Sequence, residues 1–154
     1  KLEDDPLTSL EDFNQVKGYR LPYEFYLPNS LMGWEISDKT RMIFDASTGA
    51  YVMDNIPLEN ALIKEGPPRF KLCSDSWKHQ FGFGEYITDD ESTFGVTKEG
   101  VVLRVEPAEN ASADLRIEFS EREVLLLEEN VFRVEFKLIQ WDPVPQALIR
   151  VTMR

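Results

Sequence analysis

The sequence predicts a mainly β protein: a single-domain antiparallel meander that closes into a barrel, with one or two short helices. Two observations lead to this prediction. Apolar and polar residues alternate through most of the second half of the chain, as in strands with one buried and one solvent-facing side. The stretches between these segments are short, which favours antiparallel neighbours. A two-sheet β-sandwich is the alternative architecture that the same pattern allows.

Two short helices are expected in the first half of the chain. Thr8 and Glu11 fit a capping box, so the first helix should begin there, and Gly18 can end it. Leu10 and Phe13 lie on one face of this helix, which we expect to pack on the sheet. A second helix is expected over residues 58–65, where the pattern stops at a glycine followed by two prolines.

The strands of the first half are less regular. Residues 19–28 are rich in tyrosine and phenylalanine but contain Pro22 and end at Pro28, which predicts an edge strand or an extended arm. Residues 46–49 separate two strand-like segments and predict a hairpin. A further strand is expected over residues 77–87.

Four segments after Gly100 show the alternation most clearly. Strand side chains alternate between two faces, so the polar residues that alternate with apolar ones should face solvent. In the segment 132–138 these are Arg133, Glu135 and Lys137. Residues 142–145 contain two prolines and should separate the last two strands. The apolar residues of one parity should face the core: Val101, Leu103, Val105, Leu115, Ile117, Phe119, Phe132, Val134, Phe136, Leu138, Ala147, Ile149, Val151 and Met153.

In this layout, one helix followed by an antiparallel barrel, the chain resembles calycin-type barrels. Calycins carry a signature glycine and tryptophan separated by one residue, whereas Gly33 and Trp34 are adjacent here. The resemblance is architectural, and it implies a barrel with one short helix.

Size and charge limit the function. The chain has 154 residues, of which 42% are hydrophobic and 29% charged, so we expect one globular domain over residues 1–154 with residues 1–6 frayed. The net charge of −11 is spread along the chain, which favours solubility and argues against nucleic acid and anionic membranes as partners. No apolar run approaches the roughly 20 residues that span a bilayer.

The single cysteine and single histidine exclude several kinds of site. Cys73 has no second cysteine with which to form an internal disulfide, which favours a reducing compartment. A start at Lys1 is compatible with a removed leader, so the sequence does not assign a localisation. One cysteine and His79 are too few for a zinc site. A calcium loop starting at Asp90 fails because Phe94 would fall at a ligand position. We therefore expect no metal, no cofactor and no catalytic residues.

The first functional hypothesis is a binding module for an apolar or aromatic small molecule, of the lipid or pigment type. An aromatic-lined face that also carries an imidazole and a carboxylate could orient such a ligand inside a barrel. The candidate ligand-binding residues share one parity of the strand predicted over residues 77–87: Trp77, His79, Phe81, Phe83 and Glu85.

The alternative hypothesis is a structural or assembly subunit that docks on a larger protein complex. The aromatic arm, residues 19–28, would provide the contact, because its prolines prevent full pairing in a sheet and interfaces depend on a few aromatic anchors. The candidate partner-binding residues are Tyr19, Tyr23, Phe25 and Tyr26.

Overall fold

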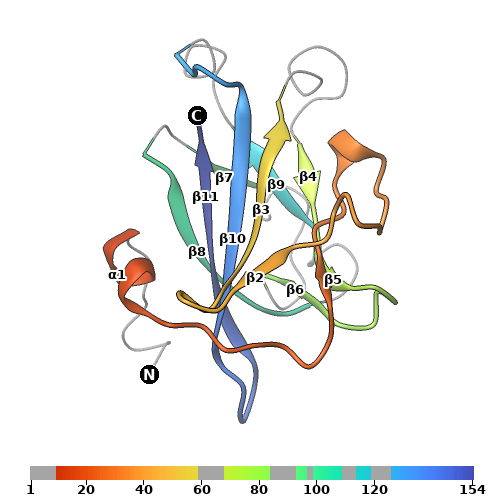
Figure 1. Ribbon diagram of the computed structural model, residues 1–154, viewed down its shortest axis with the longest axis vertical. Coiled ribbons are helices and arrows are strands. Elements are labelled where there is room, and N and C mark those ends of the chain that lie inside the picture. Colours follow the sequence, from red (N-terminus) through yellow and green to blue (C-terminus); the bar gives the residue numbers. More distant parts are fainter. Residues whose placement is uncertain (1–9, 59–67, 84–92, 97–98, 109–113, 119–125) are drawn as a thin grey trace.

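The computed structural model contains an eight-stranded antiparallel sheet that curls into a nearly closed barrel (Figure 1). The structure describes residues 10–58, 68–83, 93–96, 99–108, 114–118 and 126–154. The predicted mainly β, barrel-like fold is confirmed. In sheet order the strands are β1 (Phe25–Tyr26), β5 (Leu72–Ser74), β6 (Gln80–Gly82), β8 (Val101–Pro107), β11 (Gln146–Met153), β10 (Val131–Gln140), β3 (Ala50–Pro57) and β2 (Ile43–Asp45).

The two ends of this sheet meet through β1 and β2. The Met42 N–H donates to the Phe25 carbonyl oxygen, and the Leu27 N–H donates to the Thr40 carbonyl oxygen, both at 2.8 Å. Sequential neighbours pair at β5–β6, β10–β11 and β2–β3, while the other pairings join strands distant in the chain, so the order is not that of a simple sequential meander.

A second sheet of three strands lies beside the barrel. It consists of β4 (Arg69–Phe70), β9 (Leu115–Glu118) and β7 (Thr93–Gly95), with β7 parallel to β9. Lys71 donates its backbone N–H to the Pro28 carbonyl oxygen, which ties this sheet to the chain that continues from β1. The apolar side chains of both sheets form one core cluster.

Aromatic rings fill the middle of the barrel. The Phe25 ring centroid lies 4.6 Å from that of Phe136, 5.7 Å from that of Tyr51 and 5.9 Å from that of Phe81. All four side chains are buried. The centre of the barrel is therefore occupied by the protein's own side chains.

The inward-facing residues predicted for β8 to β11 are confirmed where they are described. The side chains predicted on β10 and β11 are buried, as are Leu115, Ile117 and Val105, and Val101 and Leu103 pack partly buried against the same core. Phe119, the capping Thr8 and residues 59–65 of the second predicted helix lie outside the described residues.

The prediction that Glu135 and Lys137 face solvent is wrong, because helix α1 (Leu10–Gln15) covers their side of β10. Lys137 Nζ donates to the carbonyl oxygens of Phe13 and Val16, at 2.6 and 2.7 Å. Glu135 accepts two hydrogen bonds from Arg150, at 2.7 and 2.8 Å. The last carbonyls of a helix lack intrahelical donors and attract a cation, which explains why a lysine is buried here.

The apolar part of this second layer is small. Phe13 packs with Val102 and Leu148, both from the outward parity of their strands. Arg133 remains partly exposed, with 35% of its side chain accessible, because the helix does not reach it. Among the described residues, no helix has both the length and the apolar character needed to cross a membrane.

We predict that Lys137→Met lowers the free energy of unfolding by about 2–3 kcal/mol, because methionine keeps the apolar stem but leaves two helix carbonyls without their charged donor. Urea unfolding would measure the loss. Lys39→Met is the matched control, since Lys39 is exposed and only its backbone N–H makes a hydrogen bond. Equal stability of the two variants would show that Lys137 does not anchor the helix.

Candidate functional site

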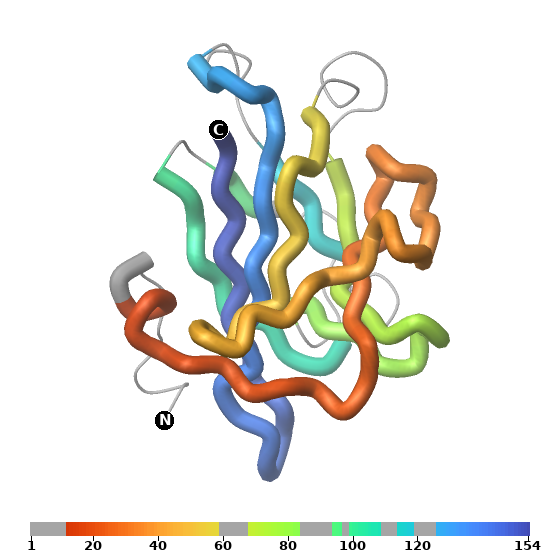
Figure 2. The backbone as a smooth tube through the Cα atoms, viewed as in Figure 1, coloured from red at the N-terminus to blue at the C-terminus, as the bar shows by residue number. Residues whose placement is uncertain are grey.

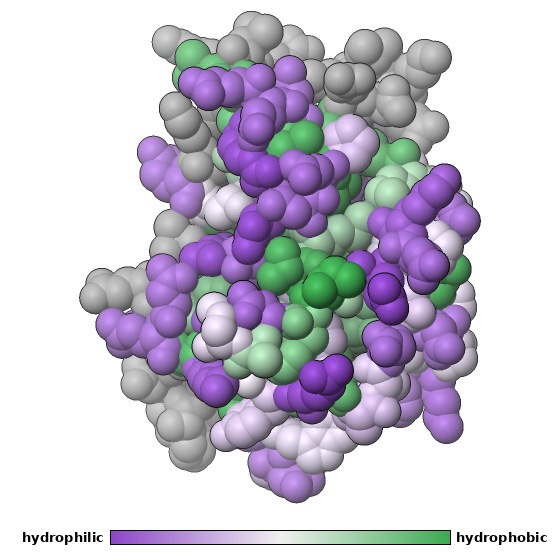
Figure 3. All heavy atoms as spheres, viewed as in Figure 1, coloured by the Kyte–Doolittle hydropathy of each residue, from purple (hydrophilic) through white to green (hydrophobic). Residues whose placement is uncertain are grey.

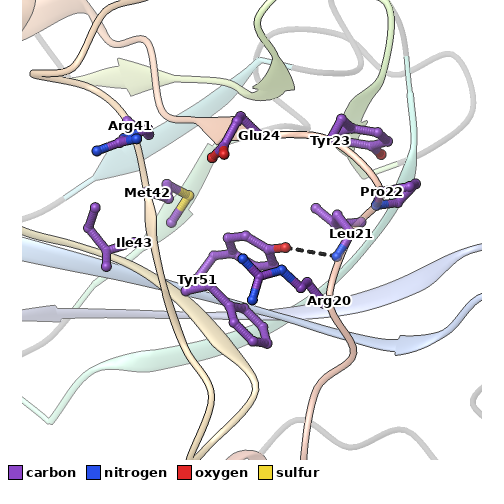
Figure 4. Close-up of a pocket in the computed structure, with 10 residues that line it drawn as sticks. Arg20, Leu21, Pro22, Tyr23, Glu24, Arg41, Met42, Ile43 and Tyr51 are labelled. Carbon is purple, nitrogen blue, oxygen red and sulfur yellow. Dashed lines mark hydrogen bonds between the residues drawn. The ribbon is translucent and has the colours of Figure 1, made fainter.

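A pocket of about 620 Å³ opens between the aromatic arm and β2, and we refer to it as the arm–β2 pocket (Figure 4). In Figure 2, the arm crosses from the helix toward β1 below the hairpin of β2 and β3. The pocket is lined by Arg20, Leu21, Pro22, Tyr23, Glu24, Arg41, Met42, Ile43, Phe44 and Tyr51.

The pocket exists because two chain segments pair and then separate. The hydrogen bond between Met42 and Phe25 closes the barrel, but the arm does not continue as a strand beside β2. Pro22 has no N–H to donate to a sheet ladder. The Leu21 N–H, which would otherwise need a strand partner, donates instead to the hydroxyl of Tyr51 at 2.7 Å. A side chain thus replaces the missing strand contact and links the arm to β3 at the edge of the pocket.

Apolar groups form the floor and one wall of the arm–β2 pocket. Tyr51 and Met42 are buried, and the Phe44 ring lies 4.8 Å from the Tyr51 ring. Burial raises the pKa of Tyr51, so its hydroxyl stays protonated and neutral near pH 7. Ile43 is 58% exposed. Figure 3 shows apolar side chains gathered in the middle of the face that carries β2, between polar neighbours.

Three charged groups complete the lining: Arg20, Arg41 and Glu24. The Arg20 guanidinium lies over the Phe44 ring, 5.0 Å from its centroid. Figure 4 shows Glu24 and Arg41 on one side of the pocket and Arg20 beside Tyr51 on the other. In the part of the chain that the structure describes, neither arginine has a carboxylate oxygen within 4.0 Å. Both are therefore available to a ligand.

The predicted ligand-binding residues do not share one strand face. Trp77 and His79 lie in the turn between β5 and β6, because β6 begins only at Gln80 and Trp77 has a left-handed backbone with φ 63°. Phe81 belongs to the aromatic core, and Phe83 is partly buried with its ring 6.0 Å from that of Phe94. Glu85 lies outside the described residues.

The predicted partner-binding residues divide between core and surface. Phe25 is fully buried in the aromatic core, and Tyr26 is half-buried and paired with Cys73 through β1 and β5. Tyr23 lines the arm–β2 pocket, and Tyr19 is 60% exposed.

The structure brings together one residue from each predicted set. The His79 ring stacks on the Tyr23 ring, with 4.4 Å between centroids and 5° between planes. Burial raises the pKa of Tyr23 to about 12, and repulsion from Tyr51, when that hydroxyl is ionised, is a smaller cause. This contact packs the β5–β6 turn against the arm. His79 does not line the arm–β2 pocket, but it contacts Tyr23, which does.

The groups that could carry covalent or metal chemistry are not gathered at the pocket. Cys73 is buried in β5, and burial raises the pKa of its thiol to about 12, which keeps it un-ionised and unreactive. Within the described ranges, no three acidic, histidine or cysteine side chains cluster closely enough to hold a metal ion.

Sequence reasoning found only Tyr23 among the residues of the arm–β2 pocket. It missed Arg20, Arg41, Phe44 and Tyr51, because they come from segments that meet only when the barrel closes. The available signal was Pro22, which marks the point where the arm leaves the sheet.

The chain has no match among known protein families, curated proteins or solved structures. Its functional residues therefore have to be identified from its own structure. Among the described residues, the arm–β2 pocket combines a hollow of small-molecule size, several apolar side chains and two arginines without a carboxylate partner.

Proposed function

We propose that this protein is a non-catalytic binding module that holds an apolar or aromatic small molecule in the arm–β2 pocket. The observation that carries the proposal is the pocket itself: its volume of about 620 Å³ falls in the range, roughly 300–1,000 Å³, of sites for small molecules. Its walls combine apolar and aromatic side chains with charged groups that could orient a ligand.

The proposed site lies at the seam of the barrel and not in its interior. The barrel centre is filled by Phe25, Phe81 and Phe136, whose ring centroids lie 4.6–5.9 Å apart. A ligand there would have to displace well-packed rings, at a cost of several kcal/mol for each large core side chain. At the seam no such displacement is needed, because the arm–β2 pocket is already open there.

A second candidate function is docking on a larger protein through the exposed part of the arm. The observation that favours it is the exposure of Tyr19, at 60%, and of Trp141 in the β10–β11 turn, at 43%. The two positions lie at the same end of the barrel, because the Tyr19 N–H donates to the carbonyl oxygen of Leu138 at 2.8 Å. Aromatic side chains of this kind are common anchors in interfaces.

The ligand proposal is tested with N-phenyl-1-naphthylamine, an uncharged aromatic dye whose fluorescence rises in apolar surroundings. We expect the purified protein to bind this dye. Ile43→Asp should weaken binding about tenfold, because the aspartate places a charge on the apolar wall of the pocket.

Val144→Asp is the matched control for that experiment. Val144 is also a β-branched aliphatic residue, 50% exposed, but it lies outside the pocket. Its dye affinity should equal that of the unmodified protein, and far-ultraviolet circular dichroism should show that both variants are folded. Equal dye affinity of the two aspartate variants, or no binding by the unmodified protein, would contradict the proposal.

A further inference from the structure

We propose that the ligand of the arm–β2 pocket is an organic monoanion: an apolar or aromatic body that carries one carboxylate or sulfonate group, which meets Arg20 while the positive charge of Arg41 across the pocket adds to the attraction. This inference rests on the proposed function and adds the chemical class of the ligand. Three observations support it, concerning the local charge, the partners of the arginines and the position of Glu24.

The first observation is that the pocket reverses the charge of the protein. The chain has 28 acidic and 17 basic residues, which gives its net charge of −11. The pocket lining has two arginines and one glutamate, which gives a net charge of +1. An acidic protein repels anions over most of its surface, so a positive pocket is the place where an anion can bind.

The second observation is that the two arginines have no carboxylate partner, unlike others in the described part of the chain. Arg133, Arg150 and Arg154 each form an ion pair within 4.0 Å. The Arg20 guanidinium lies over the Phe44 ring instead, 5.0 Å from the ring centroid. This contact with the ring does not pair the guanidinium with an acceptor oxygen, and guanidinium N–H groups match the two oxygens of a carboxylate or sulfonate.

The contact with Phe44 also places the charge of Arg20 beside the apolar wall. Phe44 contacts both the Arg20 guanidinium and the ring of Tyr51, which is buried. A ligand whose anionic group meets Arg20 would therefore lay its apolar body against Phe44 and Met42. This arrangement fits an amphipathic ligand better than a small inorganic anion, which would leave the apolar wall uncovered.

The third observation concerns the number of charges that the ligand should carry. The Glu24 carboxylate lines the same pocket as the two arginines, on the side of Arg41 in Figure 4. A second negative charge on the ligand would be repelled by this carboxylate without a further cation to neutralise it. The pocket therefore favours a monoanion over a dianion such as a phosphate monoester.

The test compares two dyes with the same aromatic body. 8-Anilinonaphthalene-1-sulfonate carries one sulfonate, and N-phenyl-1-naphthylamine lacks it. We expect the sulfonated dye to bind roughly five- to tenfold more tightly, since a solvent-accessible ion pair with Arg20 and the more distant charge of Arg41 contribute modestly. This advantage should shrink when the salt concentration is raised, because exposed charges are screened.

Variants of the two arginines test whether they cause the tighter binding of the sulfonated dye. Arg20→Gln and Arg41→Gln should each reduce the affinity for the sulfonated dye by a larger factor than the affinity for the neutral dye, so that the ratio of the two affinities falls. Arg69→Gln is the matched control, since Arg69 also lies over an aromatic ring, that of Trp34 at 5.7 Å, but outside the pocket. Its affinities for both dyes should equal those of the unmodified protein.

The outcomes separate this inference from the proposed function. The two dyes could bind with equal affinity while Ile43→Asp still weakens binding of the neutral dye. That result would overturn the inference of a monoanionic ligand and leave the pocket as a site for neutral ligands. An advantage of the sulfonated dye that persists in both Arg→Gln variants would also overturn the inference. Failure of both dyes to bind would overturn the proposed function itself.

Discussion

Replacing Phe136 by alanine is expected to lower the free energy of unfolding by about 3–5 kcal/mol, the usual cost of deleting a large ring from a packed core. Phe136 is fully buried on β10, between strands β3 and β11. Its ring lies 4.6 Å from that of Phe25 and 5.1 Å from that of Phe81. Since β10 is hydrogen-bonded on both sides, the backbone cannot move in to fill the cavity.

Urea unfolding of Phe136→Ala and of the control Tyr19→Ala measures this effect. Tyr19 is also aromatic but 60% exposed, and its backbone N–H keeps its hydrogen bond to Leu138 in the variant. The control should lose less than about 1 kcal/mol, as most surface substitutions do. A similar small loss for Phe136→Ala would mean that the aromatic cluster does not hold the barrel together.

The sequence predicts this part of the structure well because the information is local. On β10, alternation with period two marks Phe132, Val134, Phe136 and Leu138 as the inner face, and all four are buried. The hairpin at residues 46–49 and the break at residues 142–145 depend on turn chemistry that is also local. Strand identity and face therefore follow from neighbouring residues.

The same alternation cannot say what covers the outer face. Glu135 and Lys137 look like solvent-facing residues in the sequence, yet helix α1 buries them. Their partners, Phe13, Val16 and Arg150, include helix residues more than 100 positions away. Only the packing of the helix on the barrel distinguishes this buried ionic layer from a wet strand face.

The candidate site was harder to predict because it depends on how distant segments meet. Tyr51 comes from β3 and Leu21 from the arm, 30 positions apart, and their hydrogen bond shapes the arm–β2 pocket. The predicted ligand face failed to form on one strand because Trp77 adopts a left-handed turn, for which the sequence has no glycine or asparagine signal. Barrel closure is likewise a contact between two sheet edges that are distant in the chain, so no local pattern in the sequence predicts it.

Gly49→Ala is expected to lower the free energy of unfolding by about 3 kcal/mol or more, because it combines a strained backbone with a steric clash. The clash is with Gly18, the residue that precedes the arm. Gly49 ends the β2–β3 turn with φ 75°, and a Cβ atom there would lie closer than 3.0 Å to the backbone of Gly18. Gly18 in turn donates its N–H to the Thr48 carbonyl oxygen at 3.2 Å. Two glycines are needed because the two backbones touch.

Gly33→Ala is the control that separates strain from clash. Gly33 has nearly the same backbone angle, φ 73°, but a Cβ atom there has nothing within 4 Å, so its cost should be only about 1–2 kcal/mol. Equal losses in urea unfolding would show that the close approach of Gly18 and Gly49 is not needed. A larger loss for Gly49→Ala should come with weaker N-phenyl-1-naphthylamine binding, because moving Gly18 also moves Arg20 and the arm wall of the arm–β2 pocket.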